Sequence, residues 1–315
     1  MSDIVSIRKV DQRAISNADQ VEIKAIASGI AVPDLGVADE NIAGELGDLD
    51  TANIDMEPWQ EHDVQLEDEV GSARDELIRR QEQMGEAYPF VLEGGTLTYK
   101  KSASGFYEYC LGIATTPQSI TTNPYTQLPR SFERATGVIL RKHLGPKWEN
   151  LHTGWPRDEG EPKRFDELIR KISRETCEER EWCWNPSPGR PEEHGVGGDG
   201  GVDFVVWRRA PDRRIGQLFV VGQCACGEDW DTKFDDLKIE KLQPWMRPVA
   251  YVPLVRCFTT PFILSDGNFL IAHEQAGWVL DRIRLTMMSH ELADDEDVKA
   301  LWPTFGDMFQ LAAAA

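Results

Sequence analysis

Two short apolar runs near the middle of the chain predict a pair of neighbouring strands. Residues 202–207 (VDFVVW) and 218–221 (LFVV) are rich in β-branched and aromatic side chains, which favour strands. The segment between them, APDRRIG, contains the proline, aspartate and glycine that are typical of turns. Asp203 lies inside the first run, and Gln223 closely follows the second. We therefore expect a β-hairpin with polar side chains at one end of a sheet.

Helical spacing of apolar residues marks several longer segments. Residues 64–84 should form a highly charged helix, and residues 163–182 an amphipathic one. A helix over residues 129–145 should begin at its first proline and end at its last glycine, because proline is favoured in the first turn and glycine just after the end. Residues 228–242 predict another helix, whose first turns hold several aspartates that suit the helix dipole.

The remaining pattern is weaker. Residues 1–60 show little sustained periodicity, and we expect residues 31–63 to be loose, with short helices at most. Pro253 lies inside a predicted strand and restricts it to a sheet edge or a bulge, because proline cannot donate a ladder hydrogen bond. The other predicted elements are strands at 87–101, 105–115 and 248–258, a hairpin at 262–273 around Asp266, Gly267 and Asn268, and helices at 276–288 and 298–311.

This order of elements predicts an α/β protein in four parts. Residues 1–84 form an acidic N-terminal extension with a helical end, and residues 85–128 a small β-containing lead-in. Residues 129–256 form the core, and residues 257–315 a C-terminal hairpin and helices that pack on it. A chain of 315 residues is long enough to bury a sizeable core.

The formal net charge of −20 is concentrated in one stretch. Residues 31–76 hold 15 acidic residues and one basic residue, a local charge of −14 that leaves −6 for the rest of the chain. The acidic stretch disfavours nucleic-acid binding, which draws on Lys and Arg contacts to phosphates. Residues 121–250 hold 21 basic and 22 acidic residues, so the core can still carry a basic groove. The acidic stretch itself is either a solubilising tail or a segment that docks a partner or covers that groove.

Cysteine usage and hydropathy indicate a cytoplasmic protein that does not enter a membrane. The six cysteines are scattered and lack the paired spacing of a zinc site, which favours reduced, buried thiols. No apolar run approaches the length of a membrane span, and the N-terminus lacks the apolar core of a signal peptide.

Polar residues around the hairpin suggest a metal site. Asp199 lies in the glycine-rich entry to the first strand, Asp203 at the start of that strand, and Gln223 at the end of its neighbour. Together they would form a small oxygen-lined site at one end of the sheet. Oxygen ligands with several retained waters suit a divalent cation such as Mg²⁺.

The sequence GGDGGVDFVV, followed by a hairpin and a strand that ends in Gln, resembles the PD-(D/E)XK nuclease superfamily, and in particular its Mrr-like branch of restriction endonucleases. The resemblance covers residues 129–256 and implies a restriction-endonuclease-like αβββαβ core with a mixed sheet. In that branch the third motif is Q-x-K, and Gln223 matches its Gln. Ala225 stands where the motif has Lys, and Lys233, at the start of the next predicted helix, is the best substitute.

The resemblance implies a DNA endonuclease of the restriction or anti-phage defence type that uses Mg²⁺ or Mn²⁺. Asp203 would bind the metal directly, and Glu133, on the first core helix, and Asp199 would support it directly or through water. Gln223 would orient a ligand water or hold the phosphate. Lys233 would position the attacking water or neutralise charge in the transition state.

Two other functions remain open on the sequence alone. The missing motif lysine and the acidic N-terminal third favour a catalytically degenerate nuclease-fold subunit that binds nucleic acid or a protein partner in a defence complex. A protein–protein interaction module that uses the acidic segment is the third reading, and it predicts no affinity for nucleic acid. Cutting both DNA strands with one site per chain would favour a homodimer.

Overall fold

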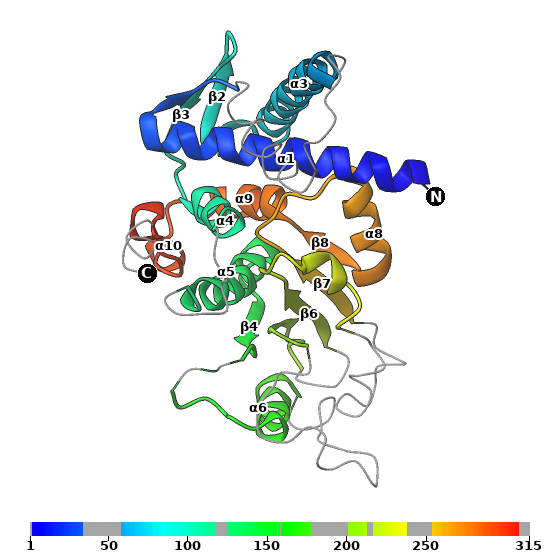
Figure 1. Cartoon of the computed structure of the whole chain (residues 1–315). Helices are drawn as coiled ribbons and strands as arrows, with labels where there is room; N and C mark the ends of the chain where they lie inside the picture. The colour runs from blue at the N-terminus through cyan, green and yellow to red at the C-terminus, as the bar shows by residue number, and fades with distance from the viewer. Residues whose placement is uncertain are drawn as a thin grey trace.

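The computed structural model describes residues 2–33, 58–116, 125–155, 157, 159–177, 201–212, 217–237 and 254–308. Over these residues the fold is mixed α/β, with a mixed five-stranded sheet and a three-stranded sheet among helices (Figure 1). The helices are α1 (Ser2–Ser28), α3 (Pro58–Met84), α4 (Phe106–Ala114), α5 (Gln127–Leu144), α6 (Phe165–Cys177), α8 (Asp266–Ala276), α9 (Arg282–His290), α10 (Glu296–Lys299) and the 3-10 turns η1 (Gly85–Ala87) and η2 (Trp230–Thr232). The strands are β1 (Ile30–Ala31), β2 (Phe90–Glu93), β3 (Thr96–Tyr99), β4 (Trp148–His152), β5 (Phe204–Arg208), β6 (Leu218–Cys224), β7 (Val255–Thr259) and β8 (Trp278–Leu280).

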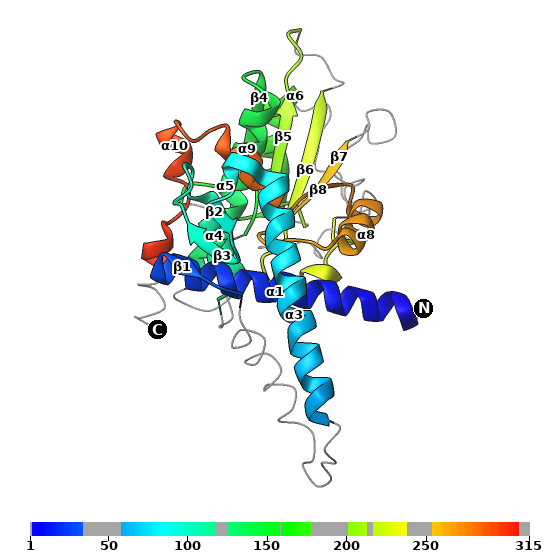
Figure 2. The same cartoon turned by 90° about the horizontal axis from the view of Figure 1, so that it is seen from above.

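The five-stranded sheet has the order β4-β5-β6-β7-β8, and its strands lie side by side in Figure 2. Strand β5 is antiparallel to both neighbours, whereas β6, β7 and β8 run parallel. The β5–β6 pair confirms the predicted hairpin, with Phe204 opposite Gly222. Strand β4 is a finding that the sequence pattern does not predict, because WENLH shows no alternation and all five side chains are half-buried.

Helices cover both faces of this sheet. The helices predicted at 129–145 and 163–182 are confirmed as α5 and α6, and each buries its apolar stripe. On one face α5 packs with residues of β5 and β6, among them Phe132, Ala135, Ile139, Phe204, Val206 and Val220. On the other face α6 packs with the side chains that point the opposite way, among them Leu168, Ile169, Ile172, Val205, Trp207, Phe219 and Val221. The sheet is thus a middle layer between these two groups of side chains.

The N-terminal part is more ordered than its sequence suggests. The weak periodicity of residues 1–60 gave no indication of α1, a helix of 27 residues that crosses the molecule between α3 and the β2–β3 hairpin on one side and α4 and α9 on the other (Figure 1). Its buried side chains follow helical spacing: Ile15, Ala18, Val21 and Ala25. Residues 34–57, which hold much of the acidic run, lie outside the described residues. The helix predicted at 64–84 is confirmed as the greater part of α3.

The strand predicted at 105–115 is wrong, because this segment is helix α4. Its aromatic and aliphatic side chains are buried on every side of the helix, with Phe106, Tyr107, Tyr109, Cys110 and Leu111 fully inaccessible. A continuous apolar run of this length has no period that separates a buried strand from a buried helix. Residues 87–101, predicted as one strand, form two strands, which are the β2–β3 hairpin.

The hairpin predicted at 262–273 is also wrong, because Asp266, Gly267 and Asn268 form the first turn of α8. The hydroxyl oxygen of Ser265 accepts a hydrogen bond from the Asn268 N–H at 3.3 Å, which is an N-cap that turns the chain into a helix. The same capping chemistry, with Asp281 accepting from the Arg284 N–H, starts α9 and splits the helix predicted at 276–288 into β8 and α9.

Two predictions about the connections around β7 need correction. Strand β7 is interior, paired with β6 and β8, and not the edge strand that Pro253 suggested, because it begins at Val255, after the proline. Pro253 itself lies outside the described residues. In place of the helix predicted at 228–242, the described residues up to 237 hold only the short 3-10 helix η2. The continuous helix predicted at 298–311 is not found over the described residues. Val298 and Lys299 end α10, and residues 305–308 form a separate helical segment.

Candidate functional site

Asp203 and Gln223 lie opposite each other at one end of the five-stranded sheet. The register that pairs Phe204 with Gly222 places Asp203 beside Gln223, and the Asp203 N–H donates to the Gly222 carbonyl at 2.9 Å. The Asp203 carboxylate accepts a hydrogen bond from the Cys224 N–H at 2.6 Å. Both predicted side chains are buried, with 9% and 6% of their surface exposed. The structure therefore brings together the two residues on which the predicted site depends.

The end of β4 completes the frame around Asp203. The N–H groups of Thr153 and Gly154 both donate to the Asp203 carbonyl, at 2.7 and 2.9 Å. The Thr153 hydroxyl donates to the carbonyl of Val202 at 2.6 Å. Three neighbouring strands thus fix the backbone of Asp203, so its carboxylate is held by the sheet and not by a loop.

Glu133 reaches this end of the sheet from α5. Its Oε2 lies 3.0 Å from Nε2 of His152, the last residue of β4, and both side chains are about 15% exposed. A Cβ on Gly154 would lie 2.3 Å from the same Glu133 oxygen, a distance that no real Cβ contact tolerates. Gly154 is therefore the residue that leaves room for the Glu133 carboxylate beside the backbone partner of Asp203.

The pKa shifts of two cysteine thiols reflect the charges at this end of the sheet. Burial raises the pKa of both Cys224 and Cys226 well above the ordinary value, and the negative charges of Asp203 and Glu133 raise both further. Lys233 acts on Cys226 in the opposite direction. The segment that directly follows Gln223 is thus within electrostatic reach of two carboxylates and one ammonium group.

Lys233 lies beside this segment and not inside the sheet. Its Nζ is 3.0 Å from Oδ1 of Asp229 and 3.7 Å from a Cβ built on Gly227, and its side chain is 32% exposed. Ala225, at the position where the resembled motif has lysine, is fully buried in an apolar cluster with Trp230 and Phe234. A lysine at position 225 would have to bury its charge among these apolar side chains. Lys233, which is partly exposed, is therefore the better candidate for the cation of the site.

Two further polar residues belong to the site and were missed by sequence reasoning. His152 holds Glu133, but it ends a strand that has no recognisable pattern. Asp236 accepts a long hydrogen bond of 3.4 Å from the Gln223 amide, and a Cβ on Gly201 would lie 3.2 Å from the Asp236 carbonyl. The sequence assigned Asp236 to the first turns of a helix, which hid its position next to Gln223.

The donor set can be tested against the implied metal ion. Among the described residues, no three histidine, cysteine, aspartate or glutamate side chains form a metal-binding group of their own. Asp199, the third predicted ligand, lies outside the described residues. The groups present are hard oxygen donors, and Mg²⁺ is commonly bound through only one or two protein carboxylates while it keeps several waters. Asp203 and Glu133, with the amide oxygen of Gln223, are donors of the type that such an ion takes.

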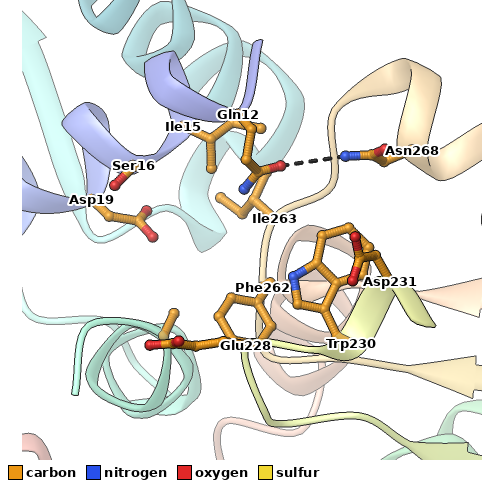
Figure 3. A pocket seen from close by; sticks show the side chains of 11 residues that line it. Gln12, Ile15, Ser16, Asp19, Glu228, Trp230, Asp231, Phe262, Ile263 and Asn268 are labelled. Atoms are coloured by element: carbon orange, nitrogen blue, oxygen red, sulfur yellow. Dashed lines mark hydrogen bonds between the residues drawn. The ribbon is translucent and has the colours of Figure 1, made fainter. Parts of the chain in front are cut away.

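A cavity of about 500 Å³ lies elsewhere, between α1, η2 and the start of α8 (Figure 3). Gln12 accepts a hydrogen bond from the Asn268 amide across its rim at 3.4 Å, drawn as the dashed line in Figure 3. Its other polar lining is mostly acidic and consists of Ser16, Asp19, Glu228 and Asp231. Trp230 and Phe262 supply aromatic surface. Carboxylates repel phosphate, and none of the predicted site residues lines this cavity.

No protein-family model, curated protein or solved structure matches the chain. The fold and the site thus define a mixed α/β protein with a polar cluster at one end of its five-stranded sheet. None of the described helices combines the length and the apolar character that a membrane crossing requires.

Proposed function

We propose that the chain is a metal-dependent DNA endonuclease of the restriction or anti-phage defence type. The observation that carries this proposal is the pairing of Asp203 with Gln223 across the β5–β6 hairpin, with the Glu133 carboxylate and the Lys233 ammonium group both within electrostatic reach of Cys226, three residues after Gln223. Four side chains that the resemblance singles out, from three separate stretches of the chain, thus lie in the neighbourhood of one end of a sheet.

The order of elements gives further support. The succession α5, β4, β5, β6 and β7 supplies a helix, three strands and a final strand, with β7 parallel to β6. The resembled αβββαβ core needs a helix in the crossover between the last two strands. In this chain that crossover includes residues 238–253, which lie outside the described residues, and α6 is an addition between β4 and β5.

In this proposal the site residues divide the work of hydrolysis. Asp203 and Glu133 would hold Mg²⁺ or Mn²⁺, with Asp199 as a further ligand. When bound, the ion lowers the pKa of a water and stabilises charge on the phosphate. Gln223 orients a water or the phosphate, and Lys233 neutralises charge that develops in the transition state. His152 keeps the Glu133 carboxylate in place.

The environment of Ala225 and Lys233 favours a second function. Because Ala225 is enclosed by apolar side chains and Lys233 is already paired with Asp229, the chain could be a catalytically degenerate subunit that binds nucleic acid or a protein partner in a defence complex. Such a subunit would keep the fold but would not cleave.

A cleavage assay separates the two functions. The purified chain is incubated with plasmid and phage DNA in Mg²⁺, Mn²⁺ or EDTA, beside Lys233→Ala and Lys299→Ala. Lys299 is a matched control, because it is 29% exposed and pairs with Glu296 one turn away, as Lys233 pairs with Asp229. We expect metal-dependent cleavage by the parent and by Lys299→Ala, and a loss of about 100-fold in Lys233→Ala, since one lost charge contact in the transition state costs about 3 kcal/mol. Intact DNA in every lane would favour the degenerate subunit.

Gly154→Ala should lower the cleavage rate about 10- to 100-fold without unfolding the protein. The added methyl group would overlap the Glu133 carboxylate, which must move away from His152. Loss of the contact between a metal ligand and the residue that orients it, here Glu133 and His152, typically has an effect of this size. The control is Gly71→Ala in α3, where an added Cβ meets nothing within 4 Å. Equal rates for the two variants would remove Glu133 from the site.

A further inference from the structure

Trp155 is an exposed aromatic side chain at the edge of the candidate site. Its side chain is 42% exposed, whereas the other tryptophan side chains that the structure describes are buried or half-buried. Its Cα is one residue, or about 3.8 Å, from that of Gly154, which lies against the Glu133 carboxylate. Trp155 offers a flat aromatic surface beside the polar groups of the candidate site.

An arginine side chain lies over one face of the Trp155 ring. The Arg157 guanidinium carbon lies 5.5 Å from the ring centroid, within the range of a cation–π contact. Arg157 is itself fixed, because its Nε donates to the Thr153 carbonyl at 3.1 Å and its Nη1 to the carbonyls of Pro162 and Lys163 at 3.2 Å each. The loop after β4 thus presents a tryptophan with a permanent positive charge beside it.

We propose that Trp155 stacks on an unpaired base of the nucleic acid, so that the chain binds single-stranded or locally unpaired DNA at its site. This inference rests on the proposed function and names its substrate class. A nucleobase offers a flat face to the indole ring, and the phosphates that flank it are attracted by Arg157 and by exposed Lys163.

The unpaired state of the base follows from the geometry of stacking. A base inside a duplex has both faces covered by its neighbours, so it has no face to offer to a side chain at the protein surface. A base in a single strand, a bulge or a flap has a free face, and aromatic side chains of proteins that bind single strands use it without regard to sequence. Trp155 would hold the nucleotide next to the phosphate that faces Asp203 and Glu133.

Binding in EDTA tests the inference without cleavage. Fluorescence anisotropy would measure the affinity of the full chain for a labelled 15-nucleotide single strand and for the same sequence as a blunt duplex. We expect tighter binding of the single strand. Trp155→Ala should weaken that binding about 5- to 150-fold, which is the range for one base–aromatic stack, and Trp155→Phe should keep most of it. Leu218→Ala, with a side chain that is 52% exposed at the other end of β6, should bind like the parent.

Equal affinity for both DNAs, no binding of either, or single-strand binding unchanged in Trp155→Ala would overturn the inference. Its failure can be told apart from that of the proposed function. Metal-dependent cleavage with an unaltered single-strand affinity in Trp155→Ala would refute only the role of Trp155. Single-strand binding that depends on Trp155, with no cleavage in Mg²⁺ or Mn²⁺, would support the inference and refute the nuclease.

Discussion

Asp203→Asn should reduce metal-dependent DNA cleavage by at least about 100-fold while the protein stays folded. Asparagine has nearly the same size and keeps an oxygen that can accept the hydrogen bond from the Cys224 N–H. What it removes is the negative charge that would bind the metal ion. Metal coordination supplies several kcal/mol of transition-state stabilisation, and each 1.4 kcal/mol corresponds to a factor of ten in rate. Initial rates on supercoiled plasmid in Mg²⁺ measure the effect.

The control for this variant is Asp294→Asn, which removes an exposed carboxylate in the turn between α9 and α10 and should cleave like the parent. Urea unfolding of Asp203→Asn should match that of the parent, which separates a loss of chemistry from a loss of fold. Cleavage by Asp203→Asn at the parental rate would show that the paired end of β5 and β6 is not where the phosphate reacts.

The part of the site that the sequence predicts is the part that local rules determine. Only residues 209–217 separate β5 from β6, so strand period and hairpin pairing together place Asp203 beside Gln223. The helical stripe of α5 likewise fixes which of its faces meets the sheet, and that leaves Glu133 at the sheet end. These residues can be placed without knowing any contact between distant parts of the chain.

The residues that were missed depend on such distant contacts. His152 ends a strand whose mixed composition gives no period, and Gly154 follows two residues later; only the pairing of this strand with β5 brings them to Asp203. Asp236 reaches Gln223 because the chain after β6 turns instead of continuing as a helix. Lys233 is placed by the same turn, which explains why its spacing from the motif alone could not define its role.

Helix α1 was missed for a different reason, which is that its inner face is partly ionic. Asp19 and Glu22 occupy positions where an amphipathic pattern requires apolar residues, and both are buried. Their partners are Arg80, 61 residues after Asp19, and Arg282, 263 residues after it. A hydrophobic pattern cannot show a helix whose buried face is completed by arginines from α3 and α9.

This buried ion cluster joins the N-terminal helices to the core. Arg282 donates to both oxygens of Asp19 at 2.9 Å, and Arg80 donates to Asp19 at 2.7 Å. Burial by itself raises the pKa of Asp19, but the charges of Arg282 and Arg80 outweigh it, and the net shift is downward. The two arginines together thus favour the ionised form of Asp19 inside the protein.

Arg282→Met should lower the free energy of unfolding by about 3–5 kcal/mol, the largest stability effect that we expect for a single substitution in this chain. Methionine fills much of the space, but it leaves the buried Asp19 carboxylate with one cation in place of two, and a buried charge that has lost a partner is costly. Urea unfolding followed by circular dichroism measures the loss. Arg164→Met, which breaks an exposed pair with Asp166, should leave the midpoint nearly unchanged.

Two further measurements tie this loss to Asp19. In the double variant Asp19→Asn/Arg282→Met the buried charge is gone, so part of the lost stability should return. The pH dependence has a definite sign: because the folded-state pKa of Asp19 is lowered, its stabilising effect is present above the unfolded pKa and is lost as the pH falls through the folded one. The stability difference between the parent and Arg282→Met should therefore narrow as the pH falls below about 4. A difference that stays constant with pH, and a double variant no more stable than Arg282→Met, would assign the loss to packing around Arg282 and not to its charge.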